Sequence, residues 1–299
     1  MRVAIIGAGL IGESWAALIT AYGHDVSLWD PAIRSDAASR IARAREDVLE
    51  LDKPASAIGA LHVADSVADA VSEAALIQEN APENLQLKHN LYRQIEEAAA
   101  PDAIIASSTS SFTWSQLAPA LERPQRLITA HPFNPPHLMP LVEIFASDAH
   151  VRDAAIAFYA GLGRAPAALN KDAPGHIANR LSSALWREAV HIVAEGIADV
   201  AAVDSAMMHG PGLRWCLIGP HMAYHLGGGA GGMASYLEHL GSSQERRWTD
   251  LGAPALTPEV RAMLVRGVAE EADGRSVEDI AAARDQALKR VRAALRGTS

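Results

Sequence analysis

The first residues that could do chemistry are a carboxylate in an apolar run and a histidine. Glu143 lies within the run Leu141–Phe145, where an isolated carboxylate is costly and takes up a proton unless it has a partner. His131 stands twelve residues earlier, directly after another apolar run. Such a pair can exchange a proton with a bound hydroxyl, the imidazole acting as base and the glutamate fixing its tautomer. A structural ion pair is the other interpretation, and the spacing leaves both open.

The segment after His131 is rich in proline. It reads Pro132-Phe133-Asn134-Pro135-Pro136, and each proline ring fixes a backbone dihedral angle. We therefore expect His131 and Asn134 to project rigidly from the carboxyl edge of a sheet, where open α/β sheets bind their ligands. Asn134 is accordingly a candidate cofactor-binding residue.

A glycine fingerprint begins directly after the first apolar run. Gly7-Ala8-Gly9-Leu10-Ile11-Gly12 supplies glycines for a tight turn, for close approach to a pyrophosphate and for helix–strand packing. The helix that it opens would present free N–H groups to the phosphates. A plain strand–turn–helix with incidental glycines is the alternative.

An acidic residue supports the cofactor interpretation. Asp30 follows the second apolar run, eighteen residues after Gly12, close to the spacing of dinucleotide-binding units. A carboxylate at this point accepts the adenosine ribose hydroxyls and repels a 2′-phosphate. We therefore predict NAD rather than NADP as cofactor.

The elements that must position these residues alternate in type over the first half of the chain. Predicted strands cover Arg2–Ile6, Asp25–Trp29, Ala60–Val63, Ala75–Gln78, Ala103–Ala106, Leu127–Ala130, Leu141–Phe145 and Ala165–Leu169. Predicted helices cover Gly12–Tyr22, Arg34–Glu50, Ser66–Ser72 and Asn84–Ala99. This alternation is typical of a parallel, doubly wound α/β sheet of the Rossmann type.

The pattern changes after about Pro174. Ile177–Glu195 has helical spacing and apolar residues nearly all round, which predicts a buried helix. The remaining chain indicates further helices and glycine-rich loops. We therefore predict an NAD-binding domain over residues 1–173 and an all-helical substrate-binding and dimerisation domain over residues 174–299.

Composition excludes several classes of function. The chain has 299 residues, is 49% hydrophobic and carries a formal charge of −9, so a nucleic-acid or anionic-membrane surface is not expected. One cysteine excludes an intrachain disulfide framework. The start has no signal-peptide pattern and no run is long enough for a membrane span, so a cytoplasmic protein is expected. His221 and His225 lack further ligands, and no metal site is predicted.

Several motifs together resemble the L-3-hydroxyacyl-CoA dehydrogenase family. They are Ala106–Ser111, His131–Pro136, Met139–Glu143 and Gly175–Arg180, and the resemblance runs from residue 1 to about 255. It implies that His131 and Glu143 are the catalytic pair and that Ser110 holds the substrate oxygen. It also implies that Asn179 contacts the substrate and nicotinamide region, and that Glu83 and Lys88 line the cofactor ribose. Ser108 and His176 depart from the family, which usually has Asn and Phe there.

The second half of the chain resembles the carnitine and gulonate 3-dehydrogenase branch of that family. The motifs are His209–Trp215, Gly219-Pro220, His225–Gly229, Gly231–Met233 and Trp248-Thr249. That branch oxidises free 3-hydroxy acids. The segment from Asp30 to Glu83 is also short for a family member with a CoA-holding helical hairpin, and Arg34–Glu50 has nearly balanced charge.

A free acid needs a cation in its binding site. Arg214 lies in an apolar, glycine-flanked segment, and its planar fork suits a carboxylate, although an interface salt bridge is the alternative. Trp186, Trp215 and Tyr224 could form an aromatic wall for a quaternary ammonium group, or simply core or interface.

These observations predict an NAD-dependent oxidation of a small free 3-hydroxy acid, carnitine-like or gulonate-like, to the 3-keto acid. The protein would be a homodimer that binds this small molecule. One alternative is a short-chain L-3-hydroxyacyl-CoA dehydrogenase. Another is a non-catalytic, crystallin-like NAD-binding protein, which the intact His131 and Glu143 disfavour.

Overall fold

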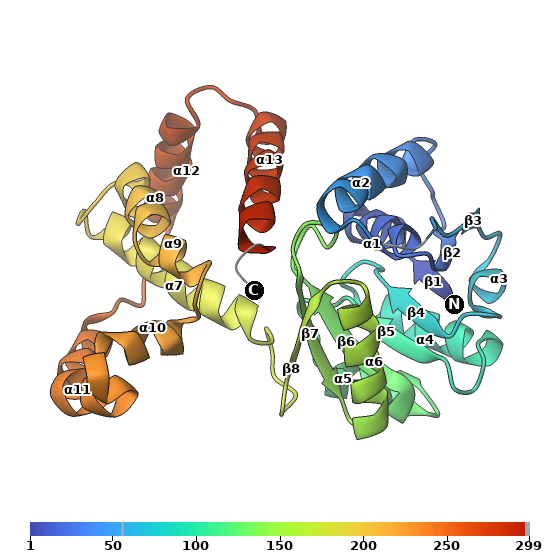
Figure 1. Ribbon diagram of the computed structural model, residues 1–299. Helices are drawn as coiled ribbons and strands as arrows, with labels where there is room; N and C mark the ends of the chain where they lie inside the picture. Colours follow the sequence, from blue (N-terminus) through green and yellow to red (C-terminus); the bar gives the residue numbers. More distant parts are fainter. Residues whose placement is uncertain (55–56, 297–299) are drawn as a thin grey trace. The chain divides into compact units, whose positions relative to one another are not determined.

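The computed structural model describes residues 1–54 and 57–296, and the chain forms two compact units, Met1–Asn179 and Arg180–Ser299. The first unit is α/β and the second is helical (Figure 1). The predicted boundary at residue 173 falls a few residues before this division. The predicted fold class, a Rossmann-type sheet followed by a helical domain, is confirmed.

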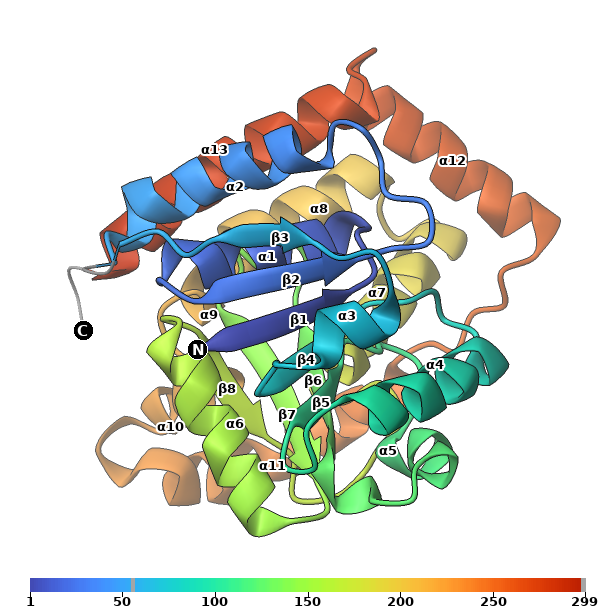
Figure 2. The ribbon, with the colours of Figure 1, turned by 90° about the vertical axis from the view of Figure 1, so that its right-hand side faces the viewer.

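An eight-stranded sheet runs through the first unit in the order β3-β2-β1-β4-β5-β6-β7-β8 (Figure 2). The strands are β1 (Arg2–Ile6), β2 (Asp25–Trp29), β3 (Leu61–Val63), β4 (Leu76–Glu79), β5 (Ile104–Ser107), β6 (Leu127–Pro132), β7 (Leu141–Ala146) and β8 (Ala165–Ala168). In this order, each two neighbouring strands from β3 through β2, β1, β4 and β5 to β6 are parallel, whereas β7 is antiparallel to β6. The last two strands therefore run against the first six.

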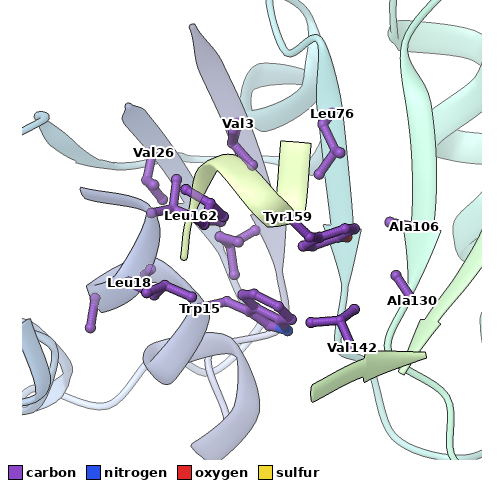
Figure 3. Packing of buried hydrophobic residues seen from close by; sticks show 14 of the residues in the cluster. Val3, Trp15, Leu18, Val26, Leu76, Ala106, Ala130, Val142, Tyr159 and Leu162 are labelled. Carbon is purple, nitrogen blue, oxygen red and sulfur yellow. The ribbon is translucent and has the colours of Figure 1, made fainter. Parts of the chain in front are cut away.

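One face of the sheet is covered by α1 (Leu10–Ala21), α2 (Ala37–Asp52) and α6 (Ala149–Gly161). Figure 3 shows Trp15 and Leu18 of α1, Tyr159 of α6 and Leu162 directly after α6, among strand residues such as Val142. The rings of Trp15 and Tyr159 lie 5.4 Å apart, in the geometry that aromatic pairs prefer. These helices therefore pack against the sheet in one of the two hydrophobic cores found among the described residues.

The opposite face is covered by α3 (Val67–Val71), α4 (Leu85–Ala98) and α5 (Trp114–Leu117). Along β1 the residues alternate between the cores: Val3 and Ile5 belong to the first, Ala4 and Ile6 to the second. Because both faces are buried, the strand has to be apolar at every position. The sheet is doubly wound, as predicted.

Helix α6 was not among the predicted elements, although a start signal is present. Asp148 caps the helix by accepting the N–H groups of His150 and Val151. A residue of this type before an apolar-periodic stretch marks a helix N-terminus. The Ala-rich composition of the helix has no strong period, which is why the pattern alone did not reveal it.

The second unit is built from helices, and α7 (Ala178–Ala194) leads into it. The others are α8 (Val200–His209), α9 (Pro211–Trp215), α10 (Pro220–Gly227), α11 (Gly232–Asp250), α12 (Pro258–Ala272) and α13 (Val277–Arg296). Over the described parts of the chain, none of the helices is sufficiently long and apolar to cross a membrane.

The prediction that the helix over Ile177–Glu195 is buried is wrong for the single chain. In α7 only Val190 and Val193 are buried, whereas Leu181 and Trp186 are 59% and 56% exposed. Apolar residues all round a helix indicate what it could bury but not whether one chain supplies enough surface to cover it.

Candidate active site

Four strands of the first unit end beside one cavity of about 520 Å³. Its lining comes from helices α1, α4 and α7, from the end of β6, and from the loops after β4, β5 and β6. It includes Ile11, Asn80, Glu83, Lys88, Ser108, Ser110, His131, Asn134 and Asn179. The strand order reverses between β1 and β4, and in doubly wound sheets ligands bind at that point. Seven of the predicted site residues thus line one cavity: Ile11, Glu83, Lys88, Ser110, His131, Asn134 and Asn179.

The fingerprint glycines follow β1, and two of them are required by the fold itself. Gly7 has a φ of +98°, and a Cβ there would lie 2.8 Å from the Asn80 carbonyl oxygen. A Cβ on Gly12 would lie 1.8 Å from the Gly7 oxygen. A Cβ on Gly9 would meet nothing within 4 Å. The protein leaves open space at the position where the motif needs a ligand to come close.

These residues fit a dinucleotide. Helix α1 starts at Leu10 with Gly9 as its N-cap, and no side chain caps it, so the first N–H groups are available to a pyrophosphate. At the end of β2, Asp30 accepts the N–H of Ala8 through one oxygen and that of Ala32 through the other, both at 2.8 Å. Each carboxylate oxygen keeps a lone pair for a ribose hydroxyl.

His131 and Glu143 face each other across β6 and β7. The antiparallel register places them directly opposite, so their side chains lie on the same face of the sheet. Nδ1 of His131 donates to Oε2 of Glu143 at 2.9 Å, and both side chains are buried. The remaining ring nitrogen, Nε2, has no hydrogen bond from the described residues, and His131 lines the cavity. A ring held in this way presents an unprotonated nitrogen to a ligand.

Glu143 has a second set of partners at the start of α7. Its Oε1 accepts the N–H groups of Ile177 and Ala178 at 2.7 and 2.8 Å. Burial raises the pKa of Glu143, but the bonds from His131, Ala178 and Ile177 lower it more, and the net shift is downward. This carboxylate therefore stabilises the fold above its ordinary pKa, and the contribution is lost as pH falls through the lowered value.

Ser110 lies in a loop that Glu83 organises. The Glu83 carboxylate accepts the backbone N–H of Ser110 at 2.7 Å, its hydroxyl at 3.2 Å and the Thr109 hydroxyl at 3.0 Å. Burial raises the pKa of Glu83, but these bonds and Lys88 lower it overall. Glu83 is thus an ionised anchor for the loop, and it also lines the cavity.

Lys88 lies at the cavity but its charge is already paired. Its ammonium group donates to Glu79 at 2.6 Å and to the Ala81 carbonyl at 3.0 Å. Glu79 is fully buried and also accepts the hydroxyls of Tyr92 and Ser107. We did not predict this buried network from the sequence. The single acidic residue at the end of the apolar β4 was the available signal, because a buried carboxylate needs a partner.

Ser108 and His176, the two residues that depart from the family pattern, both contact other residues of the site. Ser108 donates to Asn80 at 2.7 Å and accepts from Gln78 at 2.8 Å. His176 is buried and stacks on the His131 ring at a centroid distance of 5.0 Å.

The remaining candidates lie in the second unit. Arg214 is exposed on α9, and Trp215 at the end of the same helix is 39% exposed. Trp186 on α7 and Tyr224 on α10 are also exposed, and Tyr224 packs against Tyr236 at 5.0 Å. Within residues 1–54 and 57–296, no group of three or more His, Cys, Asp and Glu side chains could hold a metal ion.

Sequence models of one family match nearly the whole chain. The NAD-binding domain of 3-hydroxyacyl-CoA dehydrogenase matches residues 2–173, and the C-terminal domain of the same family matches residues 175–269. The chain belongs to the 3-hydroxyacyl-CoA dehydrogenase family.

Relatives within this family include proteins named L-carnitine dehydrogenase. The one from Streptomyces coelicolor is 43% identical over 97% of this chain and 93% of its own length. The one from Oceanobacillus iheyensis is 40% identical over 96% of this chain and 95% of its own length. The chain is accordingly an NAD-dependent dehydrogenase that acts on a CH–OH group.

Solved structures also resemble this dehydrogenase. A 5-formyl-3-hydroxy-2-methylpyridine 4-carboxylic acid 5-dehydrogenase, described as an NAD+-dependent dismutase, has a TM-score of 0.85 at 28% identity and covers 99% of this chain and 98% of its own. A 3-hydroxybutyryl-CoA dehydrogenase from Escherichia coli has a TM-score of 0.62 at 26% identity, covering 80% of this chain and 52% of its own.

The glycines of this dehydrogenase provide a matched pair of variants. We expect Gly9→Ala to leave the melting temperature nearly unchanged, since its Cβ meets nothing, but to weaken NAD binding at least tenfold, an energy of about 1.4 kcal/mol. Gly12→Ala should instead lower the melting temperature, because its Cβ collides with the Gly7 carbonyl. Calorimetry and NAD titration check both. Equal NAD affinity in Gly9→Ala and the unmodified protein would contradict the cofactor position.

Proposed function

We propose that this dehydrogenase oxidises the 3-hydroxyl group of a small free 3-hydroxy acid, carnitine-like, to the 3-keto acid. The observation that carries the proposal is the buried His131–Glu143 pair beside the cavity, with Nε2 of His131 unengaged by described residues. Relatives named L-carnitine dehydrogenase, 40–43% identical over nearly the whole chain, support the substrate class.

In this mechanism His131 is the general base. Its Nε2 takes the proton of the substrate hydroxyl. NAD, held by the glycine fingerprint and Asp30, would supply the acceptor for the hydride of the carbon that bears this hydroxyl. Glu143 stays ionised because His131, Ile177 and Ala178 all donate to it, so it stabilises the imidazolium that forms. Ser110 and Asn179, which line the cavity, hold the reacting oxygen and its surroundings.

The first unit supports a substrate without a CoA group. One helix, α2, lies between β2 and β3 in the described residues, where a CoA-holding hairpin would be longer. Two arginines in or beside α2 are paired with carboxylates of the same chain: Arg40 with Glu13, and the exposed Arg34 with Asp36. The structure with a TM-score of 0.85 is named for a free carboxylic acid, whereas the one named for a CoA thioester has 0.62.

The carboxylate of such a substrate needs a cation. Lys88 is the one lysine or arginine among the described residues that line the cavity, and Glu79 engages it at 2.6 Å. We assign the role to Arg214, whose guanidinium is exposed on α9 and can bind a carboxylate through two parallel bonds.

Replacing the pair tests the mechanism. His131→Ala should lower kcat by about 10²–10⁴-fold while NAD still binds, because general acid–base catalysis contributes that much. Glu143→Gln should also be slow, since an amide does not neutralise the imidazolium. Steady-state kinetics and NAD titration measure both effects. An almost normal kcat in His131→Ala would end this mechanism.

The substrate class is tested by comparing L-carnitine, gulonate, 3-hydroxybutyrate and 3-hydroxybutyryl-CoA. We expect the highest kcat/KM with a free acid, and a thioester preferred by tenfold or more would replace this proposal with the acyl-CoA alternative. Arg214→Lys should raise the KM for the acid because the charge remains but the fork is lost, and Arg214→Ala should nearly abolish turnover. NAD affinity is the control and should stay unchanged in both variants.

We further propose that the chain acts as a homodimer formed by the second unit. That unit exposes many large apolar side chains, including Leu181, Trp186, Met208, Leu213, Leu217, Leu226, Leu237 and Trp248. So many exposed large apolar side chains on one unit are typical of a protein that covers them at an interface. Sedimentation equilibrium at micromolar concentration should give about twice the chain mass of 31.7 kDa. A stable monomer under these conditions would contradict the dimer.

A further inference from the structure

His176 lies in an unusual turn directly before α7. Its φ is +49° and that of the preceding Gly175 is +73°, so two successive residues occupy the left-handed region, which a side chain rarely adopts. This turn brings the N–H groups of Ile177 and Ala178 onto Glu143. A histidine held in such a conformation is over-determined by its surroundings, and such residues concentrate at functional sites.

The His176 ring touches two parts of the site at once. It is 2% exposed and stacks on His131 with centroids 5.0 Å apart and planes at 18°. Its Nε2–H donates to the Thr109 carbonyl at 3.1 Å, and Thr109 directly precedes Ser110. One ring therefore connects the loop of Ser110 with the ring of His131. A phenylalanine could stack in the same way, but it has no N–H for Thr109.

The hydrogen bond fixes where a second proton could go. Because Nε2 carries the hydrogen, Nδ1 is unprotonated in the neutral ring, and it is buried with no hydrogen-bond partner in the described residues. The charged and titratable groups around the ring are His131 on β6, Glu143 on β7, Asp172 in the segment before α7, and Glu83, which binds Thr109.

A protonated His176 would place a second cation against His131. Glu143 is already bonded to His131 and to two backbone N–H groups, so it balances one positive charge and not two. Burial lowers the pKa of His176 below 6.5, in agreement with this geometry. The unfolded chain then binds the proton better, so stability falls as pH drops below that value.

We propose that His176 is a positioning residue, whose neutral ring fixes the plane of His131 and holds the Ser110 loop beside it, and whose protonation switches the site off. The inference rests on the proposed role of His131 as the base. It assigns to the stacked pair two different tasks, with one ring exchanging the substrate proton and the other keeping a single hydrogen throughout.

The direction of the reaction distinguishes the effect of protonating His131 from the effect of protonating His176. Oxidation needs an unprotonated His131, so acid slows it whatever His176 does. Reduction of a 3-keto acid needs a protonated His131, so acid should favour it until His176 is protonated. Loss of reduction at low pH therefore reports on His176, while His131 acts in the opposite direction.

Two variants of His176 separate the stacking of its ring from the hydrogen bond that its N–H donates. His176→Phe keeps a ring for stacking but loses the N–H and the titration. His176→Gln keeps an N–H donor but loses the ring and the titration. His150→Gln replaces an exposed histidine on α6 and is the control. The measurements are kcat/KM for acetoacetate with NADH across acidic and neutral pH, the KM for NADH, and melting temperature.

We expect the unmodified protein and His150→Gln to lose reduction activity as pH falls through the lowered pKa of His176, and both His176 variants to lack this loss. At neutral pH His176→Phe should be slower by roughly tenfold and His176→Gln by no more than about threefold, with the KM for NADH unchanged. The inference would be overturned if both His176 variants still lost reduction activity at acidic pH. It would also be overturned if the unmodified protein showed no such loss.

A second measurement does not depend on turnover. Nitrogen-15 NMR of the histidine side chains should show His176 with Nε2 protonated and Nδ1 unprotonated at neutral pH, and His131 with the opposite tautomer. A proton on Nδ1 of His176 would overturn this inference alone. By contrast, normal turnover in His131→Ala would overturn the proposed function and leave the NMR result as it stands.

Discussion

A buried negative charge organises the site, because Glu143 has no exposed surface and every stabilising contact must come from the protein. One oxygen takes the His131 ring and the other takes the N–H groups of Ile177 and Ala178. Removing any of these donors would leave a carboxylate in apolar surroundings, which is expensive. The same charge thus fixes the tautomer of His131 and the point where α7 begins. Asn179, the next residue, is placed as a consequence.

The reversal of β7 makes this arrangement possible. Ligands in an open sheet bind where the parallel strands end, so a carboxylate within a seventh parallel strand would lie away from the cavity. Because β7 runs antiparallel, Glu143 lies near its beginning and directly opposite His131 at the end of β6. The antiparallel pairing of β6 and β7 therefore brings His131 and Glu143 into contact, and only a short loop is needed to connect the two strands.

Much of the first unit follows from local signals in the sequence. The glycine fingerprint after β1 is recognisable from its spacing alone, although the backbone that excludes a Cβ at Gly7 belongs to Asn80. The eight strands of the described sheet follow from short apolar runs. The pairing of His131 with Glu143 was predictable because a carboxylate in an apolar strand needs a partner. The donors Ile177 and Ala178 were not, since they depend on a left-handed turn at His176 that no residue type demands. The exposure of α7 was also unpredictable, because burial depends on which surfaces cover a helix.

The role that the family resemblance implies for Lys88 differs from the contact that Lys88 makes in the structure. The family pattern places it at the cofactor ribose, and it does line the cavity, but its shortest contact is with Glu79 beneath. Each carboxylate around the site thus has its own compensation: Glu79 has Lys88, Glu83 has the Ser110 loop, and Glu143 has His131. A site balanced in this way can let the charge of one group change during a reaction while the others stay fixed. The stacking of His176 on His131 matters for this reason, since a second titrating ring would disturb a balance that the surrounding residues cannot restore.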